Sequence, residues 1–152
     1  MSDHQSDIIA KHLRQVREVI QLPDRWFQGS EAVNQFGSAT HPDSPTACRW
    51  CLTGAIKRVA FLASSDAPYK LIRDMRSAMR KAIGQGSIID FNDDSKTTHA
   101  DVLAALHRAI GEQCRRPEAD GLFWACWALF KAGNWKDELN TNDFAKHFKR
   151  QE

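Results

Sequence analysis

The chain has 152 residues, a length that suits one domain and allows a hydrophobic core. Hydrophobic residues make up 42% and charged residues 26%, which is the balance of a globular protein and excludes an intrinsically disordered chain. The 21 basic and 19 acidic residues leave a net charge of +2, too even to indicate nucleic-acid binding without a local cluster of charge.

Neither a secretion signal nor a membrane span is visible. Residues 1–7 lack the basic start and following apolar run of a secretory signal peptide. No segment approaches the roughly 20 consecutive apolar residues that a membrane-spanning helix needs. We therefore expect a cytoplasmic protein without membrane association, in which four cysteines stay as thiols: Cys48, Cys51, Cys114 and Cys126.

The chain opens with the pattern of an amphipathic helix. Apolar residues recur at steps of three and four, which predicts a helix over residues 7–21, capped by Ser6 or Asp7 and ended by Pro23. Residues 24–46 hold no long periodic run, so we expect a long loop with a short helical turn at 30–36.

Two helices are predicted in the middle of the chain. The first covers residues 47–63, where Gly54 weakens the helix but lets a neighbouring backbone approach closely. The second covers residues 67–83. It begins at Ser65-Asp66-Ala67-Pro68, which supplies a cap, an acid and a proline, and it stops at Gly84.

A loop-to-helix junction follows. Residues 87–91 are short and rich in β-formers, and without a partner strand they predict either a buried extended linker or a single helical turn. Thr98 then caps a helix that runs to about residue 113. Asp101, three residues after the cap, completes the pattern of a capping box.

Two stretches of the chain resemble a known family. The segment Cys48–Ile56 is similar to the Cys-Leu-x-Gly-Ala-(Ile/Leu) segment of a small helical domain family of unknown function from bacteria and phages. The segment Phe91–Asp93, followed by Thr98 and an apolar helix, is similar to that family's Trp-Asn-Asp and Thr-x-x-(Asp/Glu)-Val segments, with Phe91 in place of the tryptophan. The resemblance covers roughly residues 10–112. It implies a compact helical fold and no activity.

Residues 115–152 extend beyond that pattern and are rich in aromatic residues. A helix over residues 118–132 is apolar on most sides, and a last short helix carries Phe144 and Phe148 one turn apart. Together with Trp135, these two phenylalanines are the candidates for a surface that contacts a protein partner or forms a homodimer.

Two groups of residues have the types that bind metals. Cys48 and Cys51 lie at the predicted start of a helix, where a lowered thiol pKa would suit a redox pair or half of a zinc site; the alternative is two small buried hydrophobes. Asp93 and His99 lie in an acidic stretch whose oxygen and nitrogen ligands suit a cation. The favoured interpretation is structural: Asn92 and Asp93 bond their own turn, and we expect no metal and no cofactor.

Two further candidates are a basic helix face and a loop histidine. Arg73, Arg76 and Arg80 project from one face of the helix over residues 67–83, which suits phosphates or an acidic protein surface. His41 lies beside Asp43 and would orient a nucleophile such as Ser44, or Cys48 beyond it, although no nucleophile signature supports hydrolysis.

We expect an all-α, single compact domain of about five or six helices over residues 1–152, with a family-like core and a C-terminal helical extension. The predicted function is protein–protein interaction or self-association through the C-terminal helices, without enzymatic activity. Two alternatives stay open: a nucleic-acid-binding accessory protein that uses the basic face, and a metal- or thiol-dependent enzyme.

Overall fold

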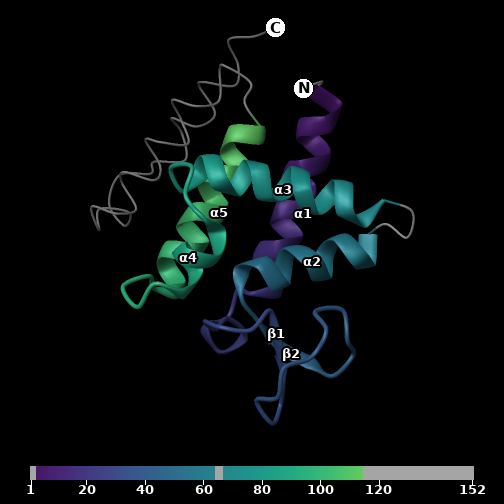
Figure 1. The fold of residues 1–152 in the computed structure, drawn as a ribbon. Coiled ribbons are helices and arrows are strands. Elements are labelled where there is room, and N and C mark those ends of the chain that lie inside the picture. The colour runs from purple at the N-terminus through teal and green to yellow at the C-terminus, as the bar shows by residue number, and fades with distance from the viewer. Residues whose placement is uncertain (1–2, 64–66, 115–152) are drawn as a thin grey trace, which may run out of the picture. The chain divides into compact units, whose positions relative to one another are not determined.

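The computed structural model describes residues 3–63 and 67–114 (Figure 1). Within these ranges a two-stranded antiparallel sheet joins β1 (Ala32–Asn34) to β2 (Ala47–Trp50), and the other elements are helical. The predicted helical fold is confirmed, with a small sheet that the residue pattern did not indicate. The helical elements are α1 (Asp3–Val19), the 3-10 turn η1 (Pro23–Arg25), α2 (Leu52–Ala63), α3 (Pro68–Ala82), α4 (Ile88–Asp93) and α5 (His99–Gln113).

The apolar faces of the four long helices meet in one core. α1 lies against α2 and α5, and α3 packs on the same two helices. Each large side chain buried there adds about 1.5–3 kcal/mol to folding as it leaves water. The fully buried members include Leu13 and Val16 of α1, Leu52 and Ile56 of α2, Met75 and Met79 of α3, and Val102 and Leu106 of α5.

No helix in the described ranges is both long and apolar enough to cross a membrane. Residues 1–114 form one compact unit of the chain. The helices predicted over residues 118–132 and near the C-terminus lie outside the described residues.

The first helix is longer than its apolar stripe predicts. α1 begins at Asp3, so Ser6 and Asp7 lie inside the helix and do not cap it. Gln5 donates a hydrogen bond to Asp74 of α3 at 3.2 Å, a tertiary contact that supports this additional turn. The helix ends before Pro23, as predicted.

The loop that follows contains the sheet, and two local predictions are wrong there. The turn expected at 30–36 is not helical, because Ala32 and Val33 are buried and pair with Trp50 and Arg49 of β2. The helix expected from residue 47 begins at Leu52. A strand of three or four residues is too short to show an alternating pattern.

Gly54 has the role that the sequence predicts. A Cβ atom at this position would lie 1.7 Å from the backbone oxygen of Glu31. The same oxygen accepts a hydrogen bond from the N–H of Cys51 at 3.2 Å. The loop before β1 therefore passes directly over the first turn of α2, and only glycine leaves room for it.

The remaining helix boundaries lie close to the predicted positions. α3 begins at Pro68 and ends at Ala82, just before Gly84 with φ +82°. Its N-cap residue is Ala67, with no side-chain cap and no acid in the first turn, so the cap and acid predicted for this start are wrong and only the proline is as predicted. The single-turn alternative for residues 87–91 is confirmed by the six-residue helix α4. α5 begins with the predicted capping box: Thr98 accepts from the N–H of Asp101, and the Asp101 carboxylate accepts from the N–H of Thr98 at 2.9 Å.

Candidate functional site

Asn92 is buried in the centre of the unit and every polar atom of its side chain is engaged. Its Oδ1 accepts hydrogen bonds from the indole N–H of Trp26 at 2.9 Å and from the backbone N–H of Leu52 at 3.0 Å. Its Nδ2 donates to the carbonyl of Phe27 at 3.3 Å and to Asp93 Oδ1 at 2.7 Å. Asn92 therefore connects α4 to the segment after η1 and to the first turn of α2.

The neighbouring residues extend this connection. Asp93 Oδ1 accepts from the N–H of Gly29 at 3.0 Å, and Gln28 Nε2 donates to the carbonyls of Asn92 and Asp94 at 2.9 and 2.8 Å. The prediction that Asn92 and Asp93 bond their own turn is wrong. Most of their hydrogen bonds reach residues 26–29 and Leu52 instead. The Asp94 carboxylate does bond its own turn, since it accepts from the N–H of Lys96 at 2.9 Å.

His99 packs away from the acidic stretch. Its Nε2 donates to the carbonyl of Ile20 at 2.7 Å, and its ring lies 5.8 Å from that of Trp26. Over residues 3–63 and 67–114, no three His, Cys, Asp or Glu side chains gather in a group that could hold a metal ion. The structure thus gives Asp93 and His99 separate contacts and does not bring them together as a ligand set.

The two cysteines of Cys-x-x-Cys also have separate roles. Cys48 lies on β2, not at a helix start, and its thiol donates to the carbonyl of Val33 at 3.5 Å. Cys51 directly precedes α2, where its sulfur accepts from the N–H of Gly54 at 3.3 Å. Burial raises the pKa of the Cys51 thiol above its ordinary value, opposite to the direction expected for a reactive helix-start cysteine.

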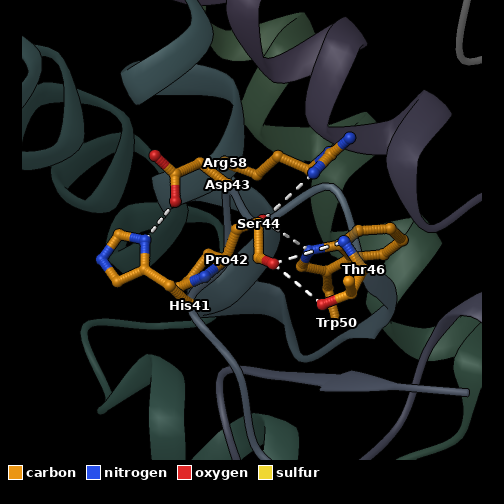
Figure 2. A network of polar contacts seen from close by, with 7 residues as sticks. All are labelled: His41, Pro42, Asp43, Ser44, Thr46, Trp50 and Arg58. Carbon is orange, nitrogen blue, oxygen red and sulfur yellow. Dashed lines mark hydrogen bonds and ion pairs between the residues drawn. The ribbon is translucent and has the colours of Figure 1, made fainter.

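The loop that carries His41 is drawn in Figure 2. The His41 Nδ1 contacts the Asp43 carboxylate, as its position in the sequence suggests. The Ser44 hydroxyl points away from the imidazole and bonds the Thr46 hydroxyl at 2.9 Å. His41 and Ser44 are therefore not arranged as a base and its nucleophile in this loop.

The predicted basic face is present on α3. Arg73 and Arg80 are exposed and Arg76 is half-buried. Asp74 lies within this face, 3.6 Å from the Arg73 guanidinium and 2.8 Å from the Lys70 ammonium, so it offsets part of the positive charge. The candidates for a partner surface on the C-terminal extension, Trp135, Phe144 and Phe148, lie outside the described residues.

A hollow that the sequence did not indicate lies between α1, η1 and α2. Its volume is about 390 Å³, within the range of sites that bind small groups. Its charged lining comes from Glu18, Arg25 and Arg58, and its apolar lining includes Val19, Trp50, Val59 and Leu62. We refer to it below as the Arg25/Arg58 hollow.

Arg58 is held against the floor of this hollow. Its guanidinium lies 4.8 Å from the ring centroid of Trp50, an arrangement that favours cation–π attraction. The Nη1 of Arg58 donates to the carbonyl of Pro42 at 3.2 Å, and the Trp50 indole N–H donates to the same carbonyl at 2.9 Å (Figure 2). The loop of residues 41–46 thereby orients both the ring and the cation above it.

Sequence reasoning missed the hollow because its parts are far apart in the chain. The α2 wall offered a weak signal, since Arg58, Val59 and Leu62 lie at the edge of its apolar face. Nothing in the spacing of residues connects Arg25 in η1 or Glu18 in α1 to that edge.

Comparison with known protein families finds a match over most of the chain. A model described as "Family of unknown function (DUF6197)" matches residues 5–112. This agrees with the resemblance seen in Cys48–Ile56 and Phe91–Asp93, and the matched range includes every residue of the Arg25/Arg58 hollow. No curated protein and no solved structure matches the chain.

Proposed function

We propose that the chain, which belongs to this family of unknown function, is a protein-binding module that accepts a short segment of its partner in the Arg25/Arg58 hollow. The observation that carries the proposal is the hollow itself: charged groups of both signs face an apolar wall in a space of about 390 Å³. Few well-placed polar groups on an apolar lining are typical of recognition sites.

The residue types that often act in catalysis have structural contacts in this domain, which favours a binding function over an enzymatic one. The amide of Asn92 and the imidazole of His99 bond backbone groups of distant segments, and the sulfur of Cys51 accepts from the backbone N–H of Gly54 in the first turn of α2. They act in holding the domain together, whereas Leu62 at the hollow is 68% exposed and free to contact a partner.

Selection from a displayed random-peptide library tests this function with the full chain as target. Selected peptides are expected to bind the Leu62→Asp protein at least about tenfold more weakly, because the new charge lies on the apolar wall. Ile89→Asp is the matched control, since Ile89 is 50% exposed and does not line the hollow. Failure to select any peptide, or equal binding to Leu62→Asp, would contradict the proposal.

Self-association through the C-terminal aromatic residues is a second form of the same function. Trp135, Phe144 and Phe148 lie outside the described residues, so this contact rests on the sequence pattern alone. Sedimentation over a wide concentration range tests it: we expect a dimer that Phe144→Asp and Phe148→Asp dissociate. A monomer at every concentration would exclude it.

Nucleic-acid binding is the alternative favoured by the basic face of α3. Arg73 has a side chain that is 74% exposed, and Arg80 is exposed about two turns later. Under this alternative, the protein binds mixed oligonucleotides at low salt, and the Arg73→Glu and Arg80→Glu proteins bind them more weakly. If no binding occurs at low salt, where attraction to phosphate is strongest, this alternative fails.

A further inference from the structure

The charges of the Arg25/Arg58 hollow are not balanced within the described residues. Two arginines and one glutamate face the space, which leaves one excess positive charge. No ion pair joins Glu18 to either arginine in the part of the chain that the structure describes. An occupant with a single negative charge would therefore match the hollow.

Arg58 is prepared to receive such a group. The Trp50 ring and the Pro42 carbonyl hold its guanidinium in place, and only one of its N–H donors is used by that carbonyl. A guanidinium carries five donors in a planar fork that matches the two oxygens of a carboxylate. Because the fork is already positioned, little side-chain entropy is lost when a carboxylate binds.

Arg25 supplies the second cation from a different element. η1 starts with Pro23, and the backbone N–H of Arg25 bonds the carbonyl of Leu22 at 3.0 Å, so the short turn sets where this side chain begins. Its guanidinium has no hydrogen-bond partner in the described ranges. One cation thus comes from the short turn after α1 and the other from the middle of α2, and both line one space.

The rest of the lining restricts what can accompany the charge. The exposed Leu62 offers apolar surface beside Arg58 on α2, and the largely buried Val59 borders it. Glu18 repels a second negative group and disfavours a doubly charged phosphate or a run of acidic residues. It also offers an acceptor for a backbone N–H of a bound segment.

We infer that the Arg25/Arg58 hollow binds an extended segment of a protein partner in which one Asp or Glu adjoins a large apolar residue. The carboxylate bonds Arg25 and Arg58, and the apolar side chain covers Leu62 where it adjoins Val59. This assignment rests on the proposed function and names the chemistry of the segment that the module selects.

Capped synthetic hexapeptides test the assignment with the full chain. The probe contains Glu-Leu flanked by Gly and Ser, and its matched controls contain Gln-Leu, Glu-Ser or phosphoserine-Leu. Amide shifts of Val59 and Leu62 report binding. Replacing Glu by Gln, or Leu by Ser, is expected to weaken binding about tenfold, and phosphoserine should bind no better than Glu.

Variants of the protein identify the groups responsible. Arg25→Gln and Arg58→Gln are each expected to weaken the Glu-Leu peptide about tenfold without changing the Gln-Leu peptide. Arg73→Gln, an exposed arginine on α3 outside the hollow, should have no effect. Arg25 is exposed, and its side chain makes no hydrogen bond or ion pair within residues 3–63 and 67–114, so its variant stays informative even if Arg58→Gln unfolds.

The outcomes separate this inference from the proposed function. Library peptides that depend on Leu62 but show no preference for an acidic residue would overturn the inference and leave the binding module standing. A phosphoserine peptide that binds more tightly than Glu-Leu would also overturn it. If no peptide binds the hollow, both fail.

Discussion

The side-chain carbonyl of Asn92 accepts a hydrogen bond from the backbone N–H of Leu52 at 3.0 Å, although the two residues are 40 positions apart. Leu52 is the first residue of α2, and its N–H has no acceptor within the helix. A side chain from α4 thus acts as part of the cap of α2, while the Cys51 sulfur serves the N–H of Gly54.

Replacement of Asn92 by Ala is expected to lower the free energy of unfolding by about 2–4 kcal/mol, because the donors of Trp26 and Leu52 would stay buried without an acceptor. Urea denaturation measures the change. Ser95→Ala in the following loop is the control, since Ser95 is exposed, and it should change stability by less than about 0.5 kcal/mol. Equal stability of wild type and Asn92→Ala would contradict the bridging role.

Replacement of Gly54 by Ala should destabilise the domain severely. The new Cβ would lie 1.7 Å from the backbone oxygen of Glu31. To relieve this clash, either the first turn of α2 must shift or Glu31 must give up its hydrogen bond to the N–H of Cys51. We expect a loss of about 3 kcal/mol or an insoluble protein.

Replacement of Gly111 by Ala is expected to stabilise the domain, in contrast to Gly54→Ala. Gly111 lies in α5, and nothing is within 4 Å of the Cβ that alanine would add. The substitution should therefore raise stability by about 0.5–1 kcal/mol, the ordinary gain of alanine over glycine inside a helix. Thermal melts of both variants compare the two sites; destabilisation of similar size at both would refute the close approach at Gly54.

The Cys51 thiol is expected to react slowly with iodoacetamide. It is 5% exposed, and burial raises its pKa, so little of the reactive thiolate is present near pH 8. Peptide mass spectrometry of the native protein should find Cys51 labelled more slowly than the half-buried Cys48. Labelling of the denatured protein gives the maximum extent of reaction for both cysteines. If Cys51 in the native protein reacts faster than Cys48, a redox role for the pair becomes tenable again.

Stability should fall in mild acid because of His107. Its Nε2 accepts a hydrogen bond from Arg17 at 2.9 Å, and burial, followed by the charge of Arg17, lowers its pKa below the ordinary 6.5. The unfolded chain therefore binds a proton at a higher pH than the folded chain does. The stabilisation is complete above about pH 6.5 and declines as pH falls from there through the lower folded-state pKa.

Urea denaturation at pH 8 and pH 5 measures this effect. His107→Gln keeps an acceptor for Arg17 but cannot take up a proton, so its loss of stability between the two pH values should be smaller than that of the wild type. An identical pH dependence of the two proteins would exclude His107 as the source.

Local patterns in the sequence predicted the elements that depend on neighbours within one turn. The stripe from Ile9 to Ile20 placed α1, and the pair Thr98 and Asp101 placed the start of α5, because periodicity and capping involve residues three or four positions apart. Gly54 is an intermediate case: a glycine inside a helix suggested a close neighbour, but only the folded chain shows that this neighbour is the carbonyl of Glu31.

The partners of Asn92 and the walls of the Arg25/Arg58 hollow came from the folded chain instead. Asn92 bonds residues 40 to 66 positions away, and Arg25 and Arg58 reach one space from a turn and a helix separated by a sheet. A residue type shows which bonds a side chain can make, but its partner depends on which segments pack together, and that follows from burial of the whole core rather than from any short stretch of residues.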